Sequence, residues 1–325
     1  MSEAPNLRTC GICGNRTGNR LHTAREMMFG MRDVFTYLEC GDCGCLQLID
    51  PPADMSPYYP PSYYSFQPLR ARRQLSSLLL RLWAKSSLEG RGWLDRILSM
   101  PRGRPKSIDW ARRAGIRLDS AILDVGSGGG QVLLRMSQCG FTNLVGVDPF
   151  LPSDIDMPGG IRLRKAELSD VEGRFDFIML HHSFEHMSNP NSAMEQLRRL
   201  IAPNGCVLIR MPVVGYAWRE YQTNWIQLDP PRHYFVHSQM STRLLAKRSG
   251  FWMDDCLTLY DSDDFQFWGS EQYKRDIPMH DRRSYLNGLR GSVFSPAEIV
   301  DFRKRAAALN AKQDGDRGDF FLRPS

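Results

Sequence analysis

Short apolar runs alternate with amphipathic stretches along the middle of the chain. The runs are rich in β-branched residues, which favour strands, and they lie at 121–125, 143–148, 175–180 and 206–211. The stretches at 129–140 and 191–205 repeat apolar positions at helical spacing. Since alternating strands and helices connect by right-handed crossovers, the pattern predicts an α/β fold with a mostly parallel sheet.

The C-terminal part continues this pattern with two capped helices. Residues 238–250 predict a helix that begins at a serine and ends at a glycine, and residues 251–260 predict a strand. Ser295 is expected to cap a second helix over 295–310, with Pro296 at its first position. The other segments predict an irregular connection and a last strand, at 261–295 and 319–324.

The composition is that of a soluble globular protein, with 42% hydrophobic and 24% charged residues in a chain of 325. It excludes a disordered chain, a collagen and a coiled coil, and the length suits about two domains. The chain has no apolar run near the ~18 residues that a membrane span needs. The first residues lack an apolar signal core. The expected location is therefore the cytoplasm.

Five of the eight cysteines lie within the first 50 residues. Cys10 and Cys13 form one C-x2-C pair, Cys40 and Cys43 form a second, and a glycine follows each pair. Four thiolates at this spacing are typical of a closed structural Zn²⁺ site. The segments between them predict the strands of a zinc ribbon, at 21–30 and 33–40. Because the protein fills all four metal positions, zinc is expected to stabilise this module rather than to take part in catalysis.

A glycine-rich loop follows the first strand predicted for the sheet. Its pattern is G-x-G-x-G, from Gly126 through Gly128 to Gly130, and it leads into a helix. Glycines let a ligand approach the backbone, and the helix N-terminus offers unpaired N–H groups. Gln131 stands where a dinucleotide fingerprint has its third glycine, which disfavours such a ligand. Asp124 precedes the loop and suits a ligand with an ammonium group.

A second carboxylate, Asp148, ends the next predicted strand, where it can accept hydrogen bonds from both ribose hydroxyls. With these features, residues 121–251 resemble class I S-adenosylmethionine-dependent methyltransferases. The resemblance implies a Rossmann-like, doubly wound sheet of seven strands. In it, Asp124 and the loop would hold the methionine part, Asp148 the ribose, and the segment at Glu167 the adenine. The cofactor-binding residues that it implies are Asp124, Gly126, Ser127, Gly128, Gly130, Asp148, Pro149, Glu167 and His181.

Histidines cluster after the strand at 175–180, in a segment that resembles the "FD…H…EH…P" pattern of the same family's small-molecule branch. They are His181, His182 and His186, with Glu185 among them. Open α/β sheets place their ligand crevice at the carboxyl ends of the strands. We therefore expect His182 and His186 to line the pocket or to act in proton transfer. A metal is an alternative that the missing H-E-x-x-H spacing disfavours, and satisfying loop backbone groups is another.

The segment 213–235 predicts a loop on the acceptor side, because it is long, irregular and rich in aromatic residues interleaved with charges. It ends in Pro231, Arg232 and His233, as relatives of the same family do before a capped helix. Methyl transfer requires an aligned nucleophile and removal of its proton, which a histidine with a pKa of about 6.5 can accept. His233 is therefore the first candidate for the general base. The alternative is that Arg232 and His233 only hold the loop in place.

The net charge of +6 is concentrated in residues 69–117, which hold thirteen Lys or Arg and three acidic residues. Apolar residues at helical spacing form one predicted stripe in this segment: Leu75, Leu78, Leu79, Leu82 and Trp83. Basic residues lie on the other side, namely Arg70, Arg73, Arg81 and Lys85. The pattern predicts a helix on an anionic membrane surface, at the inner face of the membrane, or alternatively a helix packed on the domain. No RNA-binding motif accompanies the charge, so nucleic acid is not the expected partner.

Together these features divide the chain into three predicted parts. They are a zinc ribbon at 1–50, a Tyr- and Pro-rich linker with a basic helical connector at 51–117, and a Rossmann-like domain with a C-terminal extension at 118–325. The combination resembles a bacterial subgroup that methylates sugars, nucleotide-sugars or polysaccharides. The predicted activity is S-adenosylmethionine-dependent O-methylation of a sugar in a glycan or its precursor. The alternatives are an RNA methyltransferase, a non-catalytic binding module and a nicotinamide-dependent oxidoreductase.

Overall fold

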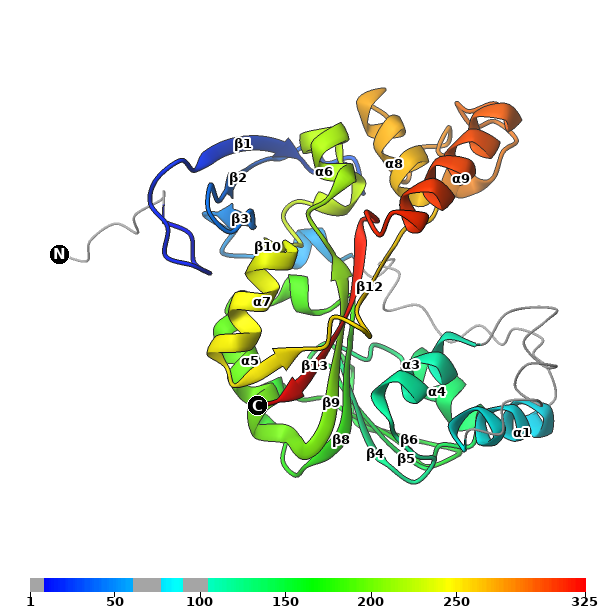
Figure 1. Ribbon diagram of the computed structural model, residues 1–325. Helices are drawn as coiled ribbons and strands as arrows, with labels where there is room; N and C mark the ends of the chain where they lie inside the picture. Colours follow the sequence, from blue (N-terminus) through cyan, green and yellow to red (C-terminus); the bar gives the residue numbers. More distant parts are fainter. Residues whose placement is uncertain (1–8, 61–76, 90–104) are drawn as a thin grey trace.

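A computed structural model describes residues 9–60, 77–89 and 105–325. Figure 1 shows a large twisted sheet with helices on both faces and a smaller sheet near the N-terminus. Parts of the predicted linker and of the basic connector, including Leu75, lie outside the described residues.

Within the described residues the large sheet has nine strands, in the order β11-β13-β9-β8-β4-β5-β7-β6, with β12 also paired to β13. Their bounds are β4 Ala121–Val125, β5 Asn143–Val147, β6 Ile155–Met157, β7 Ile161–Arg164, β8 Phe175–His181, β9 Ile201–Pro212, β11 Phe251–Met253, β12 Leu259–Asp261 and β13 Arg317–Pro324. The five strands from β9 to β7 run parallel, and those at both edges are antiparallel. The predicted α/β fold is confirmed, but the predicted number of seven strands is wrong.

The extra strands have a local cause. β6 is a three-residue strand that folds back on β7, and the stretch predicted as one strand over 251–260 breaks into β11 and β12. A turn at residues 255–257 separates these two, and both pair with the long strand β13. Short edge strands of this kind add pairing without a new apolar run, so an apolar pattern does not reveal them.

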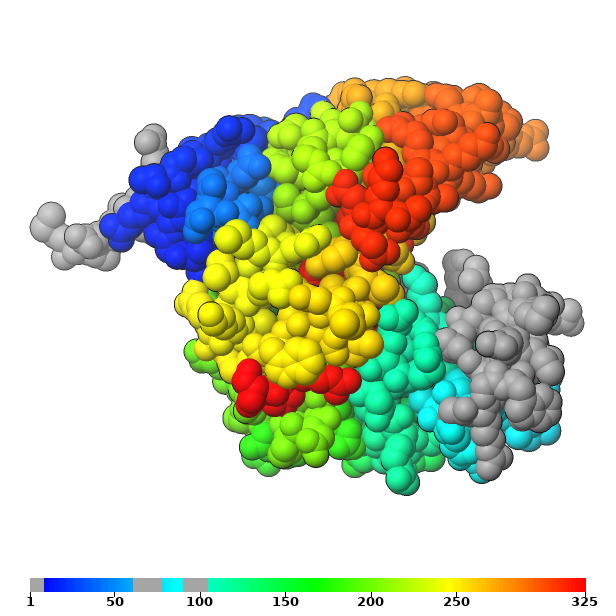
Figure 2. All heavy atoms as spheres, viewed as in Figure 1, coloured from blue at the N-terminus to red at the C-terminus, as the bar shows by residue number. Residues whose placement is uncertain are grey.

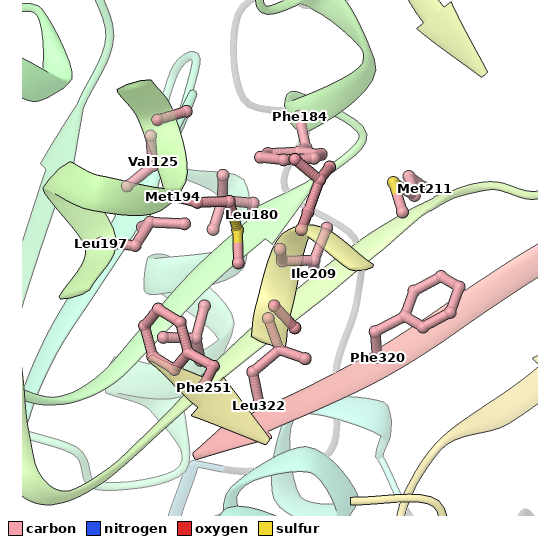
Figure 3. Close-up of a cluster of buried hydrophobic side chains, with 14 of the residues drawn as sticks. Val125, Leu180, Phe184, Met194, Leu197, Ile209, Met211, Phe251, Phe320 and Leu322 are labelled. Carbon is pink, nitrogen blue, oxygen red and sulfur yellow. The ribbon is translucent and has the colours of Figure 1, made fainter. Parts of the chain in front are cut away.

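The parallel strands are buried on both faces, as crossover helices require. On one face lie α1 Ser77–Leu88, α3 Lys106–Ala114 and α4 Gln131–Gln138. On the other face, α5 Pro190–Leu200 and α7 Gln239–Arg248 pack over β8, β9 and β13. Figure 3 shows this second core, in which Met194 and Leu197 of α5 meet Leu180, Ile209 and Leu322 of the sheet.

Two of the predicted helix caps are present. The Ser238 hydroxyl accepts a hydrogen bond from the Ser241 N–H at 3.0 Å and caps α7. Ser295 caps α9 Pro296–Ala311 and forms a reciprocal capping box with Glu298. Both helices are therefore confirmed.

Other predicted elements differ from the structure. The helix expected at 191–205 ends at Leu200, because Ile201 already pairs with Phe175 in β9 and Pro203 cannot continue a helix. Two segments predicted as irregular contain helices, α6 Tyr216–Tyr221 and α8 Phe265–Lys274. These are short helices stabilised by aromatic packing: the Phe267 ring of α8 stacks on Phe302 of α9 at 6.1 Å. Such tertiary contacts override weak local periodicity.

The N-terminal residues form a four-stranded antiparallel sheet, β1-β2-β3-β10. Its strands are β1 Arg20–Arg25, β2 Val34–Glu39, β3 Leu46–Ile49 and β10 Phe235–Val236. β1 and β2 confirm the two predicted strands, whereas β3 and β10 were not predicted. Because β10 comes from the C-terminal part, the two parts of the chain share one sheet. Figure 2 shows the N-terminal atoms in contact with the region around α6 and with α7.

The helix α1 does not pack through the predicted apolar stripe. Leu80 and Trp83 are buried against the core, whereas Leu78, Leu79 and Leu82 are exposed. The stripe is therefore split between two faces of the helix. Among the described residues, no helix is long and apolar enough to cross a membrane.

Candidate functional site

A cavity of about 720 Å³ opens at the carboxyl ends of the parallel strands. Gly126 follows β4, Asp148 follows β5, and His182 and His186 follow β8 in its wall, while Tyr59 closes it from the N-terminal part. This is the position at which open α/β sheets bind ligands.

The glycine loop is shaped by close approach to the end of β8. Gly126 has a φ of +73°, and a Cβ atom there would lie 2.5 Å from the Cβ atom of Ser183. The Ser183 hydroxyl donates to the carbonyl oxygen of Val125 at 2.7 Å. Any side chain at position 126 would push β8 away from the loop, so the glycine is required here.

Asp148 connects the loop to the cavity. Its Oδ2 atom accepts a hydrogen bond from the Gly128 N–H at 2.9 Å, and its Oδ1 atom accepts one from the Phe150 N–H at 2.9 Å. Each carboxylate oxygen has a second lone pair, so Asp148 can still accept bonds from a diol in the cavity. This placement fits the predicted ribose-binding role.

Asp124 lies beneath the loop and does not line the cavity. It is only 2% exposed, and its Oδ1 atom has no hydrogen-bond partner among the described residues. Burial, together with the charge of Asp148, raises the pKa of Asp124 to about 8. A buried carboxyl group with an unused oxygen fits a ligand that brings a positive charge, such as the ammonium group of S-adenosylmethionine.

This raised pKa makes the stability of the ligand-free protein depend on pH. Folded Asp124 keeps its proton up to about pH 8, whereas unfolded aspartate loses it near 3.9, so the folded state binds more protons between these values. Stability should therefore fall as pH rises from 5 to 8, with a slope of up to about 1.4 kcal/mol per pH unit. Urea unfolding at several pH values should give a shallower slope for Asp124→Asn. Equal slopes in the two proteins would contradict the raised pKa of Asp124.

The other candidate cofactor residues divide into two groups. Pro149 and Glu167 line the cavity, whereas Ser127, Gly128 and Gly130 form the loop behind it. His181 does not line the cavity: its ring packs on Trp110 at 4.6 Å, and burial holds its pKa well below the usual value. We therefore leave His181 out of the site.

His182 and Glu185 form a pair at the cavity wall. The His182 Nδ1 atom lies 3.3 Å from Glu185 Oε1, and the His182 side chain remains partly exposed while Glu185 is buried. Burial opposes ionisation of Glu185, but the surrounding histidines outweigh it and lower the pKa of this carboxyl to about 2. The pair thus combines a cavity-facing imidazole with a buried carboxylate.

His186 and His233 come from distant segments and meet at the same place. Their ring centroids are 4.7 Å apart with the rings at 78°. His186 lines the cavity, and burial and the neighbouring His233 lower its pKa to about 4, which keeps it neutral. His233 is 7% exposed and does not line the cavity. The structure therefore brings all three candidate catalytic histidines together, with His182 and His186 nearest the cavity.

Arg232 joins this region to the N-terminal part. Its guanidinium is fully buried and donates to Glu26 at 2.9 Å and to both carboxylate oxygens of Asp229. The Tyr37 hydroxyl donates to the backbone carbonyl of His233 at 2.7 Å. Removing one partner from such a buried pair typically costs 3–5 kcal/mol, so these contacts hold the His233 segment in place.

The four predicted metal ligands cluster in the N-terminal part. One Sγ atom from each of Cys10, Cys13, Cys40 and Cys43 lies within 4.8 Å of the others. The Cys10–Cys43 and Cys13–Cys40 sulfur pairs are 3.6 and 3.4 Å apart. Four thiolates around a tetrahedral ion with bonds of about 2.3 Å would be about 3.8 Å apart, so the donor set and its spacing fit zinc.

Sequence reasoning missed two contributors to this site, Tyr59 and Glu26, and assigned no role to a third, Glu185. Tyr59 lies in the predicted linker, yet its hydroxyl is 3.1 Å from His186 Nδ1. Glu185 was noticed only as part of a histidine-rich segment, and Glu26 had no signal in the sequence. The run of tyrosines was the one visible hint of Tyr59, because aromatic residues in a linker often cover a site.

A family model matches more than half of the chain. The sequence pattern of a family described as "Methyltransferase domain" matches residues 69–254. EEF1A lysine methyltransferase 2 from Homo sapiens is 31% identical over 108 residues, which cover 29% of this chain and 45% of that protein. The chain thus spans less than half of the length of this curated relative.

Two methyltransferases are among the solved structures to which the chain is similar. Phosphoethanolamine N-methyltransferase 2 from Haemonchus contortus, in complex with S-adenosyl-L-methionine, has 17% identity and a TM-score of 0.42. The match covers 78% of this chain and 59% of that one. Coclaurine N-methyltransferase has 14% identity and a TM-score of 0.41, and the match covers 67% of this chain and 69% of that one.

Proposed function

Because this chain belongs to the methyltransferase domain family, we propose that it transfers the methyl group of S-adenosylmethionine to a sugar hydroxyl of a glycan or glycan precursor. The observation that carries this proposal is the shared cavity. Asp148, which suits a ribose, and His182, which suits a proton acceptor, line the same space of about 720 Å³. A nucleoside cofactor and an acceptor hydroxyl can therefore meet between them.

Bound S-adenosylmethionine supplies an activated methyl group on a sulfonium. The role of the protein is to hold the acceptor oxygen in line with the methyl carbon and to take its proton. With the cofactor bound, its C–S bond would break as the O–C bond formed, and His182 Nε2 would take the hydroxyl proton. This would leave a methyl ether, S-adenosylhomocysteine and an imidazolium.

Glu185 prepares His182 for this role. Its carboxylate lies beside Nδ1, which favours the tautomer with hydrogen on Nδ1 and a lone pair on Nε2. The same negative charge stabilises the imidazolium after proton transfer. His186 and Tyr59 lie at the same wall and would orient the acceptor.

A labelled-methyl assay tests this proposal. Fractionated glycans and nucleotide-sugars are incubated with methyl-labelled cofactor, and the products are examined by NMR for O-methyl groups. His182→Asn should lower turnover by about 100-fold or more without changing the Kd for the cofactor, since proton transfer to a side chain contributes 10²–10⁴-fold. Asparagine is a suitable replacement because His182 has a φ of +54°, which asparagine tolerates.

His280→Asn is the matched control, because His280 is exposed and lies outside the cavity. It should keep full turnover. A His182→Asn protein with normal turnover would refute the proton-acceptor role. Absence of O-methyl product from every sugar fraction would refute the proposed acceptor.

Protein lysine is a second candidate acceptor. It is favoured by the 31% identity to EEF1A lysine methyltransferase 2 over 108 residues. Adding a lysine-rich protein fraction and an RNA fraction to the same assay separates the possibilities. An N-methyl-lysine product would replace the sugar proposal with this one, and labelled RNA would favour the RNA alternative.

We propose that the cluster of Cys10, Cys13, Cys40 and Cys43 holds one structural zinc ion. The turns after the two C-x2-C pairs support this zinc site. Gly14 and Gly44, which follow the pairs, have φ values of +79° and +68°. Their N–H groups donate to the carbonyls of Cys10 and Cys40, at 2.9 and 3.0 Å. The ion would stabilise the module and would take no part in methyl transfer.

A peripheral contact with an anionic membrane is also a proposal. Three leucines of α1 are exposed beside the exposed Arg81 and Lys85. A surface with apolar and basic side chains together is typical of helices that lie on anionic lipid.

A further inference from the structure

We propose that Glu185, His186 and His233 bind one divalent transition-metal ion at the cavity wall, in addition to the ion of the four cysteines. One possible ligand atom from each of the three residues lies within 4.8 Å of the other two. Two imidazoles and one carboxylate suit ions such as Zn²⁺, Fe²⁺ and Co²⁺. Three protein ligands leave coordination positions free, as in catalytic rather than structural sites.

The imidazoles of His186 and His233 are both oriented by a hydrogen bond that leaves Nε2 free to bind a metal ion. The Nδ1 atom of His186 lies 2.9 Å from the carbonyl oxygen of Arg232, and that of His233 lies 2.9 Å from the carbonyl oxygen of Gln227. A carbonyl can only accept a hydrogen bond, so each Nδ1 carries the hydrogen and each Nε2 keeps a lone pair. Metal-binding histidines are oriented by this type of second bond.

Glu185 supplies a buried carboxylate with oxygen lone pairs left for an ion. It is 1% exposed, and neither oxygen has a partner in hydrogen-bond geometry among the residues that the structure describes; His182 Nδ1 lies 3.3 Å from Oε1. Asp229 approaches His233 Nε2 at 3.9 Å, but Arg232 already engages both of its oxygens. A cation bound to Glu185 would compensate a buried charge that is otherwise costly.

The backbone that carries these groups is firmly held. His233 and the carbonyl that orients His186 belong to one segment, which the buried Arg232 fixes to Glu26 of the N-terminal part. A metal site needs such support, since its ligands must keep their geometry when no ion is bound. The three ligands are therefore positioned by contacts that do not depend on the ion.

Because His186 lines the cavity, an ion here could bind an acceptor oxygen and lower the pKa of its hydroxyl. Glu185 has two oxygens, so it can bind the ion through one and stay beside His182 through the other. This role in methyl transfer rests on the proposed function, whereas metal binding itself does not.

Titration of the full-length protein with Co²⁺ tests the site, without cofactor or acceptor. The protein is used with its cysteine-bound zinc in place, and any weakly held ion is first removed by dialysis. We expect one equivalent of Co²⁺ to bind, with d–d absorption and without thiolate charge-transfer bands. His186→Asn and His233→Asn should each weaken binding by at least about 100-fold, because asparagine can keep the bond to the carbonyl but lacks Nε2.

His237→Asn is the control, since His237 is also a buried histidine but lies outside the cluster. It should bind Co²⁺ as the wild type does. If an asparagine variant fails to fold in a thermal melt, Glu185→Gln, which keeps the side-chain shape, replaces it in the test. The proposal is overturned if the wild type binds no Co²⁺ outside the thiolate site, or if folded variants bind it normally. If the wild type binds Co²⁺ at this site but methylates no acceptor in the labelled-methyl assay, the result counts against the proposed function and not against the metal site.

Discussion

Replacing both Cys10 and Cys40 by serine is expected to release one zinc ion per chain and to unfold the N-terminal sheet. Zinc bound to four thiolates contributes about 10–16 kcal/mol in small folded modules, which exceeds the stability of most domains of this size. Metal analysis should show a zinc content lower by one equivalent, and limited proteolysis should cleave the first 50 residues.

Loss of the zinc ion should also disturb the cavity wall. Glu26 and Tyr37, which hold Arg232 and the carbonyl of His233, both belong to this module. Unfolding it would leave Arg232 without one of its carboxylate partners and would free the His233 segment. Turnover should therefore fall with the zinc content, although no cysteine lines the cavity.

Cys45→Ala provides the matched control, since Cys45 is buried in the same module but is not one of the four ligands. It should retain its zinc and its turnover. A wild-type protein that is purified without zinc, yet resists proteolysis, would rule out the structural metal.

Replacing Asp148 by alanine is expected to raise the Kd for S-adenosylmethionine by about 100-fold or more. A hydrogen bond to a charged group is worth about 1.5–3 kcal/mol, and the carboxylate would accept two from the ribose. Each 1.4 kcal/mol corresponds to tenfold in Kd. The variant also loses the bonds to the Gly128 and Phe150 N–H groups, which shape the loop. Calorimetric titration with the cofactor measures the change.

A second ligand shows whether the loss of affinity comes from the missing ribose contact or from a disturbed glycine loop. A 2′-deoxy analogue should bind the wild type more weakly than the cofactor does, but the Asp148→Ala protein should bind both alike. Glu172→Ala, an exposed acid outside the cavity, should leave both affinities unchanged. Undiminished affinity in Asp148→Ala, or an equal response of both proteins to the analogue, would remove the ribose assignment.

The local patterns that predicted the fold are those set by short-range physics. Strands β4, β5, β8 and β9 carry continuous apolar runs because the centre of a parallel sheet is buried on both faces. Ser238 and Ser295 cap their helices through bonds that span three residues. The cysteine pairs and the glycine loop likewise place their functional groups within a few residues of one another. Such short-range features can be recognised in the sequence alone.

The edge strand β6, the break between β11 and β12, and the helices α6 and α8 could not be predicted in this way. Their local periodicity is weak, and contacts between distant residues, such as Phe267 with Phe302, stabilise them. The split of the α1 apolar residues has the same cause, because the rest of the domain decides which face Trp83 buries. Periodicity predicts that a helix has an apolar face but not which neighbour will cover it.

The type of sheet, the glycine loop and the two C-x2-C pairs could be predicted from the sequence alone, because each depends on residues close together along the chain. Only the tertiary structure decided the grouping of Tyr59, Glu185, His186 and His233 around one cavity wall. These residues come from segments as far as 174 positions apart, and the bond that the buried Arg232 donates to the carbonyl oxygen of Tyr58 holds two of those segments together. Contacts between such distant positions depend on packing, which no local pattern encodes.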